Sequence, residues 1–148
     1  MRRVLFVCHG NICRSPMAEL IFKTWLLSRQ QTDWQIDSAG CSDEESGHLT
    51  DARVIRLLQT KGYAVQPKRA RQLVLSDYDA FDDILVMDDS NERRAKHFFG
   101  GDPEHKIVKL LADFPDSPSV ADPWYTGDFE SCYRDICAGL EAYLQKHT

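Results

Sequence analysis

The sequence predicts a three-layer α/β fold, in which a four-stranded parallel sheet is flanked by helices. Short β-branched and aromatic segments alternate with longer amphipathic ones, a pattern typical of βαβ units. Four segments have strand character: 4–7, 34–39, 83–87 and 106–110. The first is continuously apolar, as expected for a strand buried on both faces. Right-handed crossovers would then place helices on both sides of the sheet.

The first helix is predicted directly after the loop that follows residues 4–7. Ser15 and Pro16 suggest an N-cap followed by proline at the first helical position. The apolar residues beyond them recur at helical spacing. They are Ala18, Ile21, Phe22, Trp25 and Leu26.

Three further helices are predicted between and after the other strands. Thr50 is a candidate N-cap for a helix that buries Val54, Leu57 and Leu58 and stops at Gly62. Residues 88–91 open a short helix that ends at 100–101, and residues 129–144 form a long closing helix. No internal repeat or low-complexity segment interrupts this order.

Length and composition limit the classes of function. The 148 residues are expected to form one domain, 1–148, and the net charge of −5 argues against a nucleic-acid-binding protein. No apolar run approaches the roughly 18 residues that span a bilayer, so no membrane insertion is expected. The apolar run at residues 4–8 is too short for a signal peptide. A cytoplasmic protein is therefore expected.

The cysteines do not form a recognisable disulfide or zinc pattern. Five are present, at irregular spacing: Cys8, Cys13, Cys41, Cys132 and Cys137. An odd number without C-x-x-C pairs predicts neither a secreted disulfide framework nor a structural metal. Reduced thiols in a cytoplasm fit this usage best.

The loop after the first strand carries the strongest chemical signal. It lies where α/β sheets bind ligands, and it leads into a helix N-terminus, which favours anions. Gly10 and Asn11 readily adopt positive φ, so the backbone amides of residues 9–14 can face inward. Arg14 supplies a planar fork for phosphate oxygens. In this setting Cys8 is expected to be a thiolate, and Ser15 to donate a hydrogen bond to it.

These features together predict covalent phosphotransfer, with Cys8 as the nucleophile and Arg14 as the phosphate clamp. The spacing Cys-x5-Arg alone is weak evidence, because about 0.4 such pairs are expected by chance in a chain of this composition. The preceding strand, the following helix and the intervening Gly and Asn make the prediction specific.

The segment Val7-Cys8-His9-Gly10-Asn11-Ile12-Cys13-Arg14-Ser15-Pro16 resembles the signature loop of the low-molecular-weight protein tyrosine phosphatases. The resemblance extends over nearly the whole chain, through residues 37–40, 70–72, 87–91 and 122–125. It implies a flavodoxin-like sheet and hydrolysis of phosphomonoesters through a cysteinyl-phosphate, without metal or organic cofactor. Residues 9–15 would bind the phosphate: His9, Gly10, Asn11, Ile12, Cys13, Arg14 and Ser15.

The resemblance also implies a general acid, Asp122, which would protonate the leaving phenolate and later activate water. Pro123 holds Asp122 in an extended conformation, although Asp116 and Asp128 are alternatives from sequence alone. Trp124 and Tyr125 would form an aromatic wall for the phosphotyrosine ring. Relatives often carry Tyr-Tyr there and are regulated by its phosphorylation, for which only Tyr125 remains here.

Cys13 is implied as the partner of Cys8 in a reversible, protective disulfide; a buried side chain that supports the loop is the alternative. Cys132 and Cys137 are expected in the core, and Cys41 has no assigned role.

Several positions depart from the family pattern or support the loop. His9 replaces an apolar or small residue and would either line the pocket mouth or lie exposed. Lys68 stands where relatives carry a histidine, which puts one supporting hydrogen bond in question. Asp88 is expected to bond to the loop or to Arg14. The acidic segment 43–45 would disfavour acidic peptides around the phosphotyrosine.

Three other functions fit the sequence less well. A thioredoxin-coupled arsenate reductase would need further cysteines near 76–90, where none occurs. Protein arginine phosphatases favour threonine at the position of Ile12 and lack the Trp124-Tyr125 pair. A non-catalytic module would be expected to lose Cys8, Arg14 or Asp122. A phosphotyrosine protein or peptide is therefore the expected substrate, and a tyrosine kinase is a candidate partner.

Overall fold

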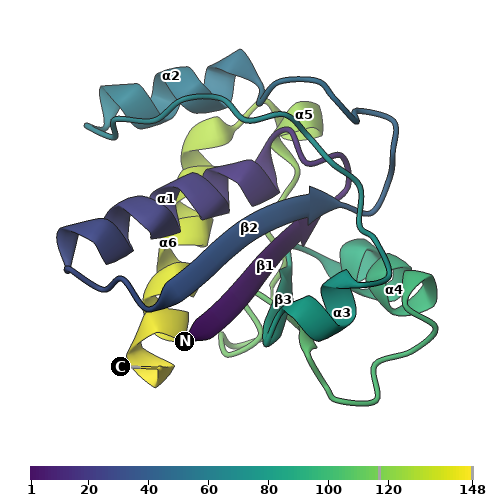
Figure 1. Ribbon diagram of the computed structural model, residues 1–148. Coiled ribbons are helices and arrows are strands. Elements are labelled where there is room, and N and C mark those ends of the chain that lie inside the picture. The colour runs from purple at the N-terminus through teal and green to yellow at the C-terminus, as the bar shows by residue number, and fades with distance from the viewer. Residues whose placement is uncertain (117, 148) are drawn as a thin grey trace.

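A parallel sheet between two helical layers forms the centre of the protein, in a computed structural model that describes residues 1–116 and 118–147 (Figure 1). The strands are β1 (Arg2–Cys8), β2 (Trp34–Gly40), β3 (Asp83–Val86) and β4 (Ile107–Lys109). Their order is β2-β1-β3-β4, and every neighbouring pair is parallel. The predicted sheet is confirmed, and its carboxyl ends share one edge.

Six helices are present in the described chain. They are α1 (Arg14–Ser28), α2 (Ala52–Thr60), α3 (Asp77–Ala80), α4 (Asp89–Phe98), α5 (Pro123–Thr126) and α6 (Phe129–Lys146). The sequence did not indicate α3 or α5, because four residues are too few to show a helical period of apolar side chains. The α5 turn begins directly after Asp122 and carries the Trp-Tyr pair.

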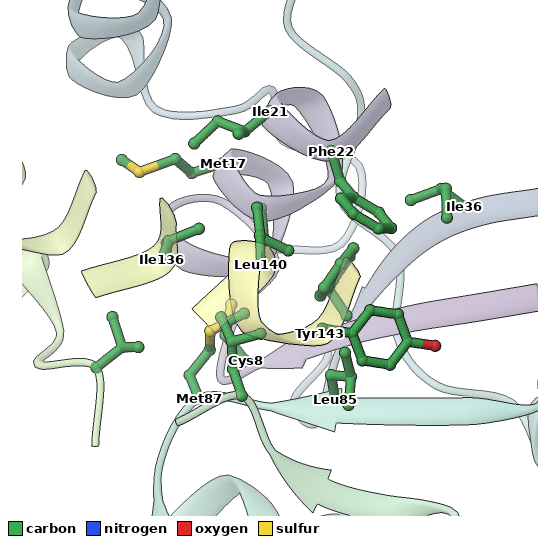
Figure 2. Close-up of a cluster of buried hydrophobic side chains, with 14 of the residues drawn as sticks. Cys8, Met17, Ile21, Phe22, Ile36, Leu85, Met87, Ile136, Leu140 and Tyr143 are labelled. Atoms are coloured by element: carbon green, nitrogen blue, oxygen red, sulfur yellow. The ribbon is translucent and has the colours of Figure 1, made fainter. Parts of the chain in front are cut away.

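Side chains of β1 alternate between two hydrophobic cores. Phe6 and Cys8 face the core shared with α1, α2 and α6, whereas Leu5 and Val7 face the core beneath α3 and α4. Figure 2 shows the first core, where side chains from the sheet, α1 and α6 meet around Leu140. Because Cys8 closes this core at the end of β1, its sulfur lies on the α1 side of the sheet.

Two predicted helix caps are wrong. The first helix begins at Arg14, so Ser15 lies inside it, and its hydroxyl oxygen lies 3.0 Å from Cys8 Sγ. For α2 the cap is Asp51, which accepts a hydrogen bond from the Arg53 amide, whereas the Thr50 hydroxyl bonds to Lys68. In both cases the hydroxyl group bonds to a residue outside the helix that it was expected to cap.

Gly139 allows α6 to pack closely against the segment after β4. A Cβ atom at this position would lie 2.5 Å from Leu110 Cγ, and Leu110 is buried. Gly139→Ala is therefore expected to lower the free energy of unfolding by about 1–3 kcal/mol through overpacking, despite the better helix propensity of alanine. Urea denaturation measures the change, with Glu141→Ala on the exposed side of α6 as control.

In a Leu110→Ala background the same glycine replacement should cost little, because its steric clash has been removed. An equal cost in both backgrounds would contradict this account of the packing.

Candidate active site

The loop of residues 9–13 connects β1 to α1 at the carboxyl edge of the sheet. The sheet register places Cys8 opposite Gly40 at the end of β2. A Cβ on Gly40 would lie 2.8 Å from the His9 carbonyl oxygen and 3.2 Å from the Asn11 nitrogen. Glycine is required there because the end of β2 touches the backbone of the loop.

The loop backbone turns its carbonyl oxygens outward. Those of Cys8, His9 and Ile12 accept hydrogen bonds from the amides of Cys41, Ser42 and Asp51 at 2.9–3.0 Å. The N–H groups of residues 9–13 find no acceptor within the described part of the chain. Such a set of free, convergent amides forms an anion-binding nest. Positive φ occurs at Asn11 (61°) but not at Gly10, contrary to expectation.

Asn11 holds this conformation from below. Its side chain is fully buried, and its amide nitrogen donates to Ser15 Oγ (2.8 Å) and Ser38 Oγ (2.9 Å). Its amide oxygen accepts a hydrogen bond from the Arg71 backbone at 3.0 Å. Three bonds to α1, β2 and the segment before α3 thus stabilise a left-handed conformation that is unusual outside glycine.

Ser15 is placed to donate to the cysteine sulfur. Its oxygen accepts the Asn11 amide hydrogen, so its own proton is free for Cys8 Sγ at 3.0 Å; the Ala39 carbonyl lies farther away, at 3.5 Å. The Ser15 hydroxyl is thus a side-chain donor in direct contact with the sulfur.

Lys68 joins the hydrogen-bond network beneath the loop through Ser38 and Glu19. Its ammonium group donates to Ser38 Oγ (3.0 Å), the Ser38 carbonyl (3.1 Å) and Glu19 Oε1 (3.0 Å). Ser38 in turn donates to Glu19 at 2.5 Å. Burial would raise the pKa of Asp37, but Lys68, the Ser38 amide and Arg71 together lower it below its usual value.

Arg14 crosses beneath the nest and is almost fully buried. Its guanidinium donates to Asp88 (2.7 Å) and to the Val120 carbonyl (2.9 Å), and it lies 3.4 Å from Asp122. Burial alone would lower the pKa of Arg14, but the Cys8 sulfur and the two carboxylates raise it above its usual value. The expected contact between Asp88 and Arg14 is confirmed, and it holds the fork in one orientation.

Asp122 faces the Arg14 guanidinium with its carboxylate and lines the same cavity as Cys8. It is the N-cap of α5, where one carboxylate oxygen accepts the Trp124 amide hydrogen at 3.0 Å and the other faces Arg14. Trp124 and Tyr125 follow at once, with 55% and 84% of their surfaces exposed. The Arg53 guanidinium lies over the Trp124 ring, 5.6 Å from its centroid.

These residues enclose a cavity of about 260 Å³. It is lined by Cys8, His9, Gly10, Ile12, Cys13, Arg14, Glu44, Glu45, Asp122, Trp124 and Tyr125. Asn11 and Ser15 lie beneath the loop, fully buried, and are not among the lining residues. Glu44 and Glu45 place the acidic segment at the rim, as expected, whereas Asp43 lines a neighbouring cavity.

Cys13 shares the cavity wall with Cys8, and both are buried as free thiols. Burial raises the pKa of Cys13 far above its usual value, and nearby Asp51 and Cys8 raise it further. Burial likewise raises the pKa of Cys132 to about 12. Cys132 lies in the core and Cys137 is partly buried against it, as predicted.

Neither a metal cluster nor a membrane-spanning helix is found in the described residues. No group of three or more His, Cys, Asp or Glu side chains there is arranged to hold a metal ion. Of the helices at 1–116 and 118–147, none is both long and apolar enough to cross a bilayer.

A family model described as low molecular weight phosphotyrosine protein phosphatase matches residues 3–148. The chain belongs to this family. A relative of the same name from Gallus gallus is 37% identical over 152 residues, which cover 99% of this chain and 96% of the relative. The family consists of hydrolases, and the chain is accordingly an enzyme of the protein-tyrosine-phosphatase class.

Solved structures confirm the fold. YfkJ from Bacillus subtilis matches with a TM-score of 0.91 and 36% identity, over 100% of this chain and 97% of that one. An arginine phosphatase from Drosophila matches with a TM-score of 0.89 and 33% identity, over 100% and 98%. The fold is therefore common to proteins named for two different phosphorylated side chains.

Sequence reasoning missed Glu19 and the partners of Lys68. Glu19 interrupts the apolar face of α1, between Ala18 and Phe22, and is 4% exposed. A carboxylate inside an apolar helical stripe was the available signal, because a buried charge requires a partner.

Glu19 binds two lysines that differ in burial, and this allows a matched test of the network. Lys68→Met is expected to lower the free energy of unfolding by about 2–4 kcal/mol, because it removes the less exposed of the two cations that contact the buried Glu19 carboxylate. Lys23 contacts the other Glu19 oxygen at 2.6 Å but is half exposed, so Lys23→Met should cost below about 0.5 kcal/mol. Urea denaturation at neutral pH compares them, and equal losses would contradict the role of Lys68.

Proposed function

We propose that this protein, in a single catalytic domain, hydrolyses phosphotyrosine in proteins and small aryl phosphates through a cysteinyl-phosphate. One observation carries the proposal. The sulfur of Cys8, the guanidinium of Arg14 and the carboxyl group of Asp122 line one small cavity together with a loop whose amides are unpaired. Cys8 is the nucleophile, Arg14 clamps the phosphate, and Asp122 is the acid and then the base.

In the first step the Cys8 thiolate attacks phosphorus. The S–P bond forms as the bond to the phenolic oxygen breaks, and Asp122 transfers its proton to that oxygen. The amides of residues 9–14 and the Arg14 fork hold the three phosphoryl oxygens, whose charge increases toward the transition state. The electron pair of the broken bond leaves with the phenol.

In the second step Asp122, now a carboxylate, takes a proton from water. The water oxygen attacks phosphorus, the S–P bond breaks, and inorganic phosphate forms. The departing sulfur regains its negative charge, which the Ser15 hydroxyl stabilises from 3.0 Å. The cycle returns each group to its starting protonation state.

The aromatic residues beside the cavity favour an aryl phosphate. Trp124 and Tyr125 flank the entrance with large exposed surfaces, and Ile12 lines the wall. A flat phenol ring gains from such contacts. Protein arginine phosphatase is the second candidate, because the Drosophila arginine phosphatase shares the fold at 33% identity. A higher kcat/KM on phosphoarginine than on phosphotyrosine in the same peptide would favour it.

The substrate proposed is a phosphotyrosine protein, with a tyrosine kinase as the opposing enzyme. Tyr125 is 84% exposed, which makes it accessible for phosphorylation beside the cavity. A cytoplasmic location suits the five free thiols and the reduced sulfur that the chemistry needs. A phosphoproteome of cells that lack the protein would identify the substrates.

Hydrolysis of para-nitrophenyl phosphate in EDTA tests the mechanism. Cys8→Ser is expected to abolish turnover, because it removes the nucleophile. Asp122→Asn should lower kcat by about 10²- to 10⁴-fold, the usual contribution of general acid–base catalysis. Asp128→Asn is the matched control: Asp128 caps α6 and does not line the cavity, so its rate should stay near wild type.

Turnover that survives in Cys8→Ser, or that chelation abolishes in the wild type, would overturn the proposed mechanism.

We also propose that peroxide oxidises Cys8 and that Cys13 then closes a reversible disulfide with it. The sulfenic acid formed on Cys8 would condense with the Cys13 thiol and release water. Wild type is expected to lose activity with peroxide and regain it with a thiol reductant. The Cys13→Ser variant should recover much less activity, because without a resolving thiol the Cys8 sulfur is oxidised further to sulfinic acid. Cys137→Ser serves as control. Equal recovery in all three proteins would count against the disulfide.

A further inference from the structure

A second cavity of about 560 Å³ adjoins the catalytic one. Its walls come from the loop after β2, from Gln72 and from α4: Cys41, Ser42, Asp43, Glu44, Gln72, Arg93, Arg94, His97 and Phe98. Glu44 lines both cavities, and Arg94 in the second bonds to His9 in the first at 3.1 Å. A peptide whose phosphotyrosine occupies the catalytic cavity would thus place a neighbouring residue beside Arg94.

The α4 wall carries positive charge that no carboxylate neutralises. Arg93 and Arg94 form no ion pair with any residue at 1–116 or 118–147. The arginines closest to the catalytic cavity differ: Arg14 binds Asp88 and Asp122, and Arg53 binds Asp51 with two hydrogen bonds. The α4 guanidiniums therefore retain donors for an incoming anion.

His9 fixes the orientation of Arg94. Its Nδ1 accepts a hydrogen bond from Arg94 Nη1, so in this neutral tautomer the ring proton is on Nε2, which lies 3.5 Å from a Glu44 oxygen. The Glu44–His9–Arg94 chain holds one N–H of the guanidinium and leaves its other donors for a ligand. A preoriented fork binds carboxylates better than a free one.

The opposite wall carries Asp43 and Glu44, which repel anions. Glu44 faces a neutral His9 ring and Asp43 makes no ion pair in the described residues, so the structure pairs neither carboxylate with a cation. The two arginine forks lie together across from them, on the α4 wall. A carboxylate bound on the α4 side contacts both guanidiniums directly, whereas the acidic loop faces it only across the cavity.

We propose that this cavity is a specificity subsite for an acidic side chain next to the phosphotyrosine of the substrate, with Arg94 as its principal ligand. The proposal rests on the proposed function and adds to it a preferred class of substrate. Since the cavity borders the catalytic pocket on the α4 side, the preference should apply to one flank of the phosphotyrosine only.

Matched phosphotyrosine peptides test the subsite. One sequence is made with Asp or Asn at each of the two nearest positions on either flank, and kcat/KM is measured at low ionic strength. Wild type is expected to prefer Asp about two- to fivefold on one flank, and high salt should abolish the preference. Arg94→Gln should remove it and Arg93→Gln should reduce it.

Arg56→Gln, an exposed arginine on α2 outside both cavities, is the control and should keep the preference. All four proteins should hydrolyse para-nitrophenyl phosphate at similar rates, because that substrate has no flanking residue; this also shows that the variants fold.

No preference in the wild type, or one that persists in Arg94→Gln, would overturn the subsite. A preference for Lys over Asn at these positions that is lost in Asp43→Asn would also overturn it. In that case the acidic loop after β2, and not α4, would determine which peptide binds. A wild type that hydrolyses aryl phosphate but shows no selectivity refutes the subsite alone. One that hydrolyses neither peptide nor aryl phosphate refutes the proposed function itself.

Discussion

The candidate site depends on the buried side chain of Asn11. A loop whose amides point inward requires at least one residue in a left-handed conformation, and here it is a residue other than glycine, at φ 61°. The energetic cost is offset by three hydrogen bonds, to Ser15 on α1, Ser38 on β2 and the Arg71 backbone. Three separate segments are thereby joined at one amide group. The nest, the helix start and the strand edge are held by the same contacts.

The same network connects the sulfur to a charged pair deep in the protein. Cys8 contacts Ser15, Asn11 links Ser15 to Ser38, and Ser38 bonds to both Glu19 and Lys68. The Ser15 hydroxyl accepts from Asn11 and the Ser38 hydroxyl from both Asn11 and Lys68, so each has its own proton left for Cys8 and Glu19 respectively. The permanent charge of Lys68 suits the neighbouring buried carboxylate of Glu19. The position of the Cys8 sulfur is thus tied to the stability of the fold.

The charged residues at the base of the cavity are paired differently from those at its rim. The buried Arg14 is paired with both Asp88 and Asp122, so its guanidinium is held by two carboxylates at the base of the site. At the rim, acidic residues of the loop after β2 face unpaired arginines of α4. In the proposed function a phosphate binds at the base through backbone amides, which carry no net charge, and the residues that flank it meet the charges at the rim. Recognition of the phosphate and of its sequence context are therefore separable.

The sequence by itself determined the alternation of strands and helices, because the period of apolar residues is a local property. It likewise predicted the chemistry of residues 8–15, because these residues form one contiguous motif. It also indicated Asp122, through the Asp-Pro turn and the family pattern. Only the tertiary structure decided that Ser15 does not cap α1, that Lys68 reaches Glu19 across 49 positions, and that the 41–44 loop faces α4. These contacts follow from strand order and register, which bring distant segments together and leave no periodic signal in the chain.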